Sequence, residues 1–173
     1  MQFRQVIITS HSTLNFNTRD LTNMLLSSLT RNARDNITSL LLVYKQYYMQ
    51  VIEGSPHNIE DLLTRLRGDS RMNNVTVIRD TMVDHRDFGD WLMGFKDVTT
   101  SEISHQYIAY TFAIKRDMMS GSSERNGDFH SAEIEDTTPH ITRLFAPPSS
   151  DISVEDLQRL GDDAYLFIKN VFK

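Results

Sequence analysis

The chain has 173 residues, a formal net charge of −5 and no cysteine. This length fits one domain with an appendage, and the absence of cysteine excludes disulfides, thiol nucleophiles and cysteine-ligated metals. The negative charge argues against general nucleic-acid binding, which needs a basic face. No apolar run reaches the roughly 20 residues that span a bilayer, and the N-terminal stretch MQFRQVIITS lacks the apolar region of a signal peptide. We therefore expect a cytoplasmic protein with no nucleic-acid or membrane partner.

The first part of the chain alternates predicted strands and helices. Strand-type runs of β-branched and aromatic residues occupy 3–9, 36–44, 47–53 and 74–83, and a short one starts at Trp91. After the first strand, Asn17 caps a predicted helix that carries apolar residues at helical spacing and ends near residue 34. Ser55 and Pro56 start a second helix, and Gly68 ends it.

The order of these elements predicts the fold class. A link of only Lys45 and Gln46 joins the second and third strands, which indicates an antiparallel hairpin. Strand, helix, strand, strand, helix, strand is the order of a ferredoxin-like α+β fold. We expect one sheet with both helices packed on one face.

The pattern changes in the last part of the chain. A helix from about 101 to 118 is predicted by the spacing of Ile103, Tyr107, Tyr110 and Ile114. Turn-forming residues then predict a long loop over about 119–150, and Ser153 caps a last predicted helix. The sequence therefore divides into a domain over 1–97 and a C-terminal helical extension over 98–173.

One predicted strand carries an unexpected amide. The segment YYMQVIEG, residues 47–54, places Gln50 inside an otherwise apolar run. An amide presents two donors and an acceptor, and leaving such groups unpaired in the interior costs on the order of 1–3 kcal/mol. Gln50 therefore needs a partner, which is either neighbouring backbone or a bound polar ligand.

Four segments carry a family pattern: RNARDNITSLLL (31–42), YYMQVIEG (47–54), LTRLRGDSRMNNV (63–75) and DFGDWLMGF (87–95). At this spacing and in this strand–helix order they resemble the BLUF family, the flavin-binding blue-light sensor domains. The resemblance covers about the first 97 residues. It implies that a flavin, FAD, lies between the two helices and the sheet. It also implies two C-terminal helices that pack on the sheet.

The resemblance assigns cofactor-binding roles to single residues. It implies that Gln50 contacts the N5/C4 carbonyl edge of the flavin and that Asn32 bonds to the pyrimidine end of the ring. Two further pairs match family positions that hold the flavin or lie near the glutamine: Arg65 with Asp69, and Trp91 with Met93. Each has a structural alternative, because Asn32 also suits a helix C-cap, Arg65 and Asp69 suit a surface ion pair, and Trp91 and Met93 suit a core.

The first strand departs from the family pattern. The family has a tyrosine two residues before a serine, whereas here Ile8 precedes Ser10, and the first 43 residues contain no tyrosine. In the family that tyrosine gives an electron to light-excited flavin, and its proton follows through the glutamine. Isoleucine has neither an oxidisable group nor a hydroxyl to orient Gln50. We expect the usual photocycle to fail at its first step, with Trp91 left as an alternative electron donor.

Two further departures affect the expected pocket. Arg31 replaces an uncharged residue that commonly sits beside the ring, so it either clamps a flavin carbonyl or phosphate or crowds the pocket. Ser39 stands where the family has glycine, and its hydroxymethyl group adds bulk where close approach is expected.

These observations favour a flavin-binding BLUF-type regulatory protein that acts through protein contacts with an impaired photocycle. The alternatives are a functional blue-light photoreceptor with an altered electron donor and a cofactor-free interaction module. An enzyme on this scaffold finds no support, because the sequence has no glycine-rich phosphate loop and no nucleophile motif, and the fold alone implies no activity.

The sequence also leads to expectations about metal ions, protein partners and self-association. No metal site is expected, because the spacing between potential ligands does not match that of known metal sites. These potential ligands are Asp84, His85, His105, His130 and His140. The sequence shows no attached catalytic or DNA-binding domain, so we expect a separate downstream protein partner. Output is expected through the C-terminal helices and a self-association surface that makes a homo-oligomer. We expect the stripe of Tyr107, Tyr110 and Ile114 to pack within the molecule.

Overall fold

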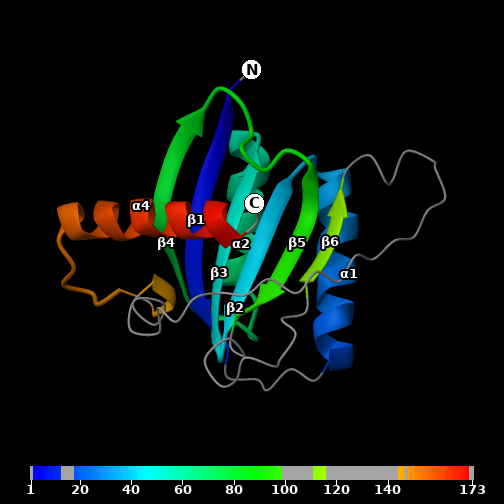
Figure 1. The fold of residues 1–173 in the computed structure, drawn as a ribbon, viewed down its shortest axis with the longest axis horizontal. Helices are drawn as coiled ribbons and strands as arrows, with labels where there is room; N and C mark the ends of the chain where they lie inside the picture. The colour runs from blue at the N-terminus through cyan, green and yellow to red at the C-terminus, as the bar shows by residue number, and fades with distance from the viewer. Residues whose placement is uncertain (1, 13–17, 99–110, 116–143, 147, 172–173) are drawn as a thin grey trace.

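The structure is a computed structural model that describes residues 2–12, 18–98, 111–115, 144–146 and 148–171. Figure 1 shows a single sheet with helices on both of its faces. The elements, in chain order, are β1 (Phe3–His11), α1 (Thr18–Arg34), β2 (Thr38–Tyr44), β3 (Tyr47–Gly54), α2 (Pro56–Arg67), β4 (Asn73–Val83), β5 (Trp91–Asp97), β6 (Thr111–Lys115) and α4 (Val154–Val171). The predicted ferredoxin-like α+β plan is confirmed over the first part of the chain.

The sheet has the strand order β4-β1-β3-β2-β5-β6. β1 pairs antiparallel with both β3 and β4, and the hairpin of β2 and β3 is antiparallel as predicted. Lys45 adopts a positive φ of 56° in the tight hairpin link. β5 joins β2 in parallel. β3 and β2 therefore occupy the middle of the sheet, with β1 beside β3, and the alternating side chains of β3 reach both faces of the sheet.

Alternation along the strands produces two buried layers. Val6, Ile8 and Ile52 face α2 in one layer, and α1 packs with Leu41 and Phe95 on the same side of the sheet. The opposite side of the sheet carries the cluster of Ile7, Leu40, Leu42, Met49 and Val51 with the buried residues of α4. In Figure 1, α4 lies across β4 and β1 on the face away from α1 and α2.

The helix caps follow the predicted local signals. The backbone N–H of Asn58 donates to Ser55 Oγ at 3.2 Å, with Pro56 in the first helical position of α2. The backbone N–H of Asp156 donates to Ser153 Oγ at 3.1 Å at the start of α4. Both caps satisfy donors that a helix N-terminus leaves unpaired. The cap predicted at Asn17 lies outside the described residues.

The helix predicted over 101–118 is wrong in its described part. Residues Thr111–Lys115 form β6, which pairs antiparallel with β5. The segment TFAIK alternates aromatic and β-branched residues with small or polar ones, so it also suits a strand, and the edge of β5 supplies the backbone partners that a helix would not use. The rest of that range, with Tyr107 and Tyr110, and most of the predicted loop 119–150 lie outside the described residues.

Helix α4 sits unusually close to the sheet. Leu160, Gly161, Ala164 and Ile168 form its buried face. A Cβ added at Gly161 would lie 2.3 Å from the carbonyl oxygen of Ile78 in β4, so only glycine permits this approach. Among the described residues, no helix is long and apolar enough to cross a membrane.

Candidate functional site

A cavity opens between α1, α2 and the sheet. Its volume is about 110 Å³. The lining residues combine apolar walls with amides and charges: Met24, Ser28, Arg31, Asn32, Leu41, Tyr48, Gln50, Leu62, Arg65, Leu66, Asp69, Arg71, Met72 and Met93. Six of the nine predicted site residues therefore meet in one place, namely Arg31, Asn32, Gln50, Arg65, Asp69 and Met93.

Gln50 lies on the sheet side of this cavity with a side-chain partner. Its amide nitrogen donates to Ser39 Oγ at 2.7 Å, and the Ser39 hydroxyl donates in turn to the Met93 sulfur at 3.4 Å. Ser39 is fully buried, whereas Gln50 is partly exposed to the cavity. Ser39, the predicted departure from the family pattern, thus occupies one hydrogen bond of the amide that the resemblance assigns to the flavin.

Asn32 projects from α1 onto β5. Its amide nitrogen donates to the backbone carbonyl of Leu92 at 2.8 Å and approaches the Met93 sulfur at 3.9 Å. Asn32 is buried and lies two residues before the end of α1, so its side chain joins helix to sheet instead of capping the helix. This bond fixes one wall of the cavity.

The charges at the cavity are arranged in pairs with one exception. Arg65 pairs with Asp35 at 3.1 Å, and Arg71 pairs with Asp69 at 2.6 Å, so the ion pair considered between Arg65 and Asp69 is wrong. The hydrogen bonds from Arg71 lower the pKa of Asp69 more than burial raises it. Among the described residues Arg31 forms no hydrogen bond or ion pair, and its charge acts only at longer range by helping to lower the pKa of Asp69.

The remaining predicted residues lie beside or behind the cavity. Ile8 pairs with Gln50 across β1 and β3, points to the same face and is 2% exposed. It packs in the apolar layer beneath α2. Trp91 instead packs against the cluster on the α4 side of the sheet and does not line the cavity. The pairing of β5 with β6 shifts register between Trp91 and Met93, which explains why these two residues do not share a face.

Sequence reasoning missed Tyr48, a cavity residue that can be oxidised. Tyr48 precedes Gln50 by two positions in β3, so strand alternation places both side chains on the cavity face. The tyrosine is 5% exposed and lines the cavity. Burial, aided by the charge of Asp97 and opposed by a hydrogen bond with Ser12, raises the pKa of Tyr48 to about 12, so the phenol stays protonated at neutral pH.

The residues at this cavity fit a flavin ring in their chemistry. Leu41, Leu62 and Leu66 offer apolar walls for a planar ring, and the amides of Asn32 and Gln50 offer donors and acceptors at its edge. The volume of about 110 Å³ is below the roughly 300 Å³ at the low end of ligand pockets. A bound ring therefore has to displace flexible lining side chains, of which the partly exposed Met24 and Met72 are the most adaptable.

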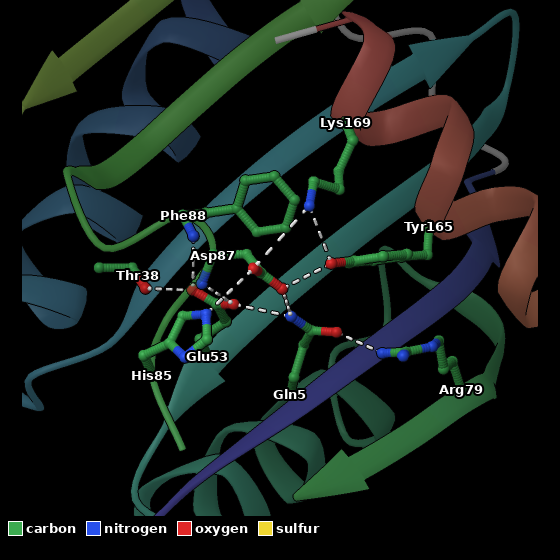
Figure 2. A network of polar contacts seen from close by, with 9 residues as sticks. All are labelled: Gln5, Thr38, Glu53, Arg79, His85, Asp87, Phe88, Tyr165 and Lys169. Carbon is green, nitrogen blue, oxygen red and sulfur yellow. Dashed lines mark hydrogen bonds and ion pairs between the residues drawn. The ribbon is translucent and has the colours of Figure 1, made fainter. Parts of the chain in front are cut away.

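A second polar cluster lies on the opposite face of the sheet. Glu53 is fully buried and accepts hydrogen bonds from the Gln5 side chain at 2.8 Å and from the backbone N–H groups of Asp87 and Phe88 at 2.9 and 3.0 Å. The Gln5 amide nitrogen also donates to Asp87 at 2.9 Å. Figure 2 shows Gln5 between the two carboxylates, with Arg79 donating to its oxygen.

Helix α4 completes this cluster. The Tyr165 hydroxyl donates to the Asp87 carboxylate at 2.7 Å, and Lys169 donates to the Tyr165 oxygen at 3.2 Å (Figure 2). Burial raises the pKa of Asp87, but the hydrogen bonds from Tyr165 and Gln5 and the charge of Lys169 outweigh it, so the net pKa is lowered. The cluster ties the C-terminal helix to β1, β3 and the loop before β5. Among the described residues, no group of three or more potential metal ligands is present.

The fold and the site therefore define a small α+β domain with a partly polar cavity between two helices and its sheet. The family model described as "BLUF: Sensors of blue-light using FAD" matches residues 3–94. The match spans more than half of the chain, so the chain belongs to the BLUF family of flavin-binding sensor domains. Such domains are sensor modules and not enzymes in themselves. No curated protein sequence matches the chain.

Several solved structures, one of them described as a BLUF protein, have a similar fold. A bacterial light-regulated adenylyl cyclase is 22% identical with a TM-score of 0.54, over 56% of this chain and 28% of the cyclase. BlrB, a BLUF protein in its dark state, is 24% identical with a TM-score of 0.53, over 56% of this chain and 73% of BlrB. BlrP1 from Klebsiella pneumoniae, in a complex with manganese and cyclic diGMP, is 22% identical with a TM-score of 0.53, over 57% of this chain and 25% of BlrP1. At these identities the likeness establishes the fold alone.

Proposed function

We propose that this chain is a flavin-holding regulatory module whose usual light reaction is impaired and whose output passes through α4. The family membership supports a flavin, and the cavity between α1 and α2 supplies residues of suitable chemistry to hold it. Gln50 and Asn32 are proposed to hydrogen-bond the ring edge. The apolar residues of both helices are proposed to cover its faces.

The observation that carries the impaired reaction is the pairing of Ile8 with Gln50. Position 8 faces the same side as the amide and is almost fully buried, so its side chain is the neighbour of Gln50 in β1. An isoleucine side chain can give neither an electron nor a proton, and it cannot orient the amide by a hydrogen bond. The amide of Gln50 therefore lacks the proton path that would rearrange it after illumination.

The test compares Ile8→Tyr with Ile8→Phe. The phenylalanine variant has nearly the same added volume and lacks only the hydroxyl, so it controls for the overpacking cost of about 1–3 kcal/mol. Flavin-loaded protein is scanned by absorption before and after blue light. We expect no persistent red shift in the original chain or in Ile8→Phe, and a red shift in Ile8→Tyr. A persistent red shift in the original chain would refute the impaired reaction, and a chain that takes up no flavin would leave a cofactor-free interaction module.

We propose that the polar cluster around Glu53 carries the output. β3 presents Gln50 to the cavity and, three residues later, Glu53 to the opposite face, where the cluster holds Tyr165 and Lys169 of α4. A change in the position of β3 caused by flavin binding is therefore transmitted to the hydrogen bonds beneath α4. The partner is proposed to be a protein that binds the outer face of α4, where Val154 and Leu166 are exposed.

Hydrogen–deuterium exchange tests this route. Amide exchange over 154–171 is compared in flavin-free and flavin-loaded protein, with α1 as the expected site of direct protection. We expect exchange in α4 to change on loading in the original chain and to become insensitive in Glu53→Gln, which weakens the acceptors of the cluster. Identical exchange in α4 with and without flavin would refute the route while leaving flavin binding intact.

The flavin is proposed to be FAD. Three arginines line the cavity, two of them already paired with aspartates, so Arg31 remains for a phosphate or a flavin carbonyl. Chromatography of the flavin released from purified protein identifies the form that is bound. A predominance of FMN or riboflavin would contradict this choice.

A further inference from the structure

The oxidisable aromatic rings are divided unequally between the two faces of the sheet. The described residues include five tyrosine or tryptophan side chains. Four of them, Tyr44, Tyr47, Tyr165 and Trp91, belong to or pack against the cluster on the α4 face. Only Tyr48 lies on the other side and lines the cavity between α1 and α2. Tyr48 is therefore the one described phenol or indole on the side where the flavin is proposed to bind.

The neighbours of Tyr48 place it close to any ring held in the cavity. Its side chain shares the cavity face with Gln50 two residues later and with Leu41 on the adjacent strand. Tyr48 is 5% exposed, so its ring is a wall of the cavity and not a solvated surface group. Trp91 is separated from the cavity by the sheet itself, because it packs with the opposite layer.

We propose that Tyr48 donates an electron to a light-excited flavin in this cavity, and this inference rests on the proposed function. One electron leaves the phenol ring of Tyr48, and the flavin is reduced by that one electron. The phenolic proton stays within the hydrogen bond between Tyr48 and Ser12. The electron then returns to Tyr48, so both partners are regenerated, no covalent bond is made or broken and no external oxidant or reductant is consumed.

The hydrogen bonds explain why this transfer does not rearrange the amide. The Tyr48 hydroxyl is bonded to Ser12, whereas the Gln50 amide nitrogen donates to Ser39. In the part of the chain that the structure describes, these two hydrogen bonds lead to different serines, so neither of them carries a proton from the phenol to the amide. Tyr48 therefore quenches the excited flavin and dissipates the light energy, and it does not replace the missing tyrosine of position 8 as the source of a signal.

The experiment measures the fluorescence lifetime of bound FMN. FMN is chosen because FAD is quenched by its own adenine, and binding is measured separately by equilibrium dialysis. We expect a strongly shortened lifetime in the original chain and a severalfold longer lifetime in Tyr48→Phe, whose ring cannot be oxidised. Tyr48→Trp, which restores an oxidisable ring, is expected to keep the lifetime short. Tyr47→Phe and Trp91→Phe are matched controls on the opposite face, and both are expected to leave the lifetime unchanged.

Each result decides the assignment. A lifetime as long as that of free FMN in a flavin-loaded original chain overturns it, as does a lengthening in Trp91→Phe with none in Tyr48→Phe. A longer lifetime in Tyr48→Trp as well as in Tyr48→Phe would mean that Tyr48 only shapes the cavity, which also overturns it. If dialysis shows no bound flavin, the proposed function fails together with this inference. Bound but unquenched FMN removes this inference alone.

Discussion

Replacing Gly161 by alanine tests how α4 is seated on the sheet. Gly161 faces β4 at Ile78, the residue skipped where the pairing of β1 and β4 shifts register. The added Cβ would lie 2.3 Å from the Ile78 carbonyl oxygen and 3.0 Å from Arg79 Cβ. The nearest obstacle is backbone in a paired strand, so it cannot swing aside as a side chain would. The helix itself has to move.

The size of the effect follows from these distances. Ordinary contact begins at 3.4 Å, so a gap of 2.3 Å requires a displacement of about 1.1 Å. Overpacking of this kind costs about 1–3 kcal/mol. A displacement also strains the bond from Tyr165, one turn further along α4, to Asp87, and a lost hydrogen bond costs about 0.5–1.5 kcal/mol. The better helix propensity of alanine returns about 1 kcal/mol, which leaves a net loss of about 0.5–3.5 kcal/mol.

Urea unfolding followed by circular dichroism measures this loss. The control is Leu166→Ala on the same helix, because Leu166 is 58% exposed and its truncation should change stability by less than about 0.5 kcal/mol. Amide exchange over 154–171 shows whether the loss arises in α4. We expect faster exchange there in Gly161→Ala and little change in α1.

The opposite result would refute the close approach of α4 to β4. At an exposed helical position, glycine to alanine stabilises a protein by about 0.5–1 kcal/mol. If Gly161→Ala is more stable than the original chain by that amount, no backbone lies against Gly161 in solution. The proposed output route through Tyr165 and Asp87 would then lose its structural basis.

Three further changes are expected to have measurable effects. Tyr165→Phe should lower the free energy of unfolding by about 0.5–1.5 kcal/mol. The lowered pKa of Asp87 contributes stability that is lost as pH falls through that pKa. Tyr165→Phe should therefore also shift the acid limb of the stability–pH curve to higher pH. An unshifted limb would contradict the hydrogen bond between Tyr165 and Asp87. Lys96 is 3% exposed, and burial lowers its pKa. Lys96→Met should therefore raise the free energy of unfolding, and the stability of the original chain should rise with pH as the lysine loses its charge. A methionine variant that is less stable in urea unfolding would show that the ammonium has a partner. Ser39→Gly frees the Gln50 amide and should tighten flavin binding in a fluorescence titration, whereas an unchanged Kd would mean that Ser39 does not compete with the flavin.

The elements that the sequence predicted correctly are those with local signals. Ser55, Pro56 and Gly68 mark the ends of α2 within a few residues, because caps and turns depend on neighbours in the chain. The hairpin of β2 and β3 follows equally from its short link. The grouping of Asn32, Gln50 and Arg65 in one cavity came from the family resemblance, which local signals could not provide.

The strand β6 and the separation of Trp91 from Met93 could not be predicted from the sequence, because both depend on the pairing of β5 with β6. The local pattern of TFAIK suits a strand as well as the predicted helix, and only the pairing with the edge of β5 decides that it forms β6. Simple alternation puts Trp91 and Met93 on one face, but the register shift between them separates the two side chains. β3 has regular alternation, and this alternation places the side chains of Tyr48 and Gln50 on the same face of the sheet. Tyr48 could therefore have been predicted from the sequence as a cavity residue.

The two faces of β3 link the proposals together. On one face, Ile8 pairs with Gln50 and Ser39 accepts a hydrogen bond from its amide, and we propose that both contacts hinder a rearrangement of Gln50. On the other face, Glu53 keeps a complete set of hydrogen bonds that reaches α4. A chain whose light reaction is hindered but whose connection to α4 is intact can still respond to whether the cavity holds a flavin. If the proposed function holds, we expect occupancy of the cavity by flavin, rather than illumination, to be the signal that the proposed route transmits to α4.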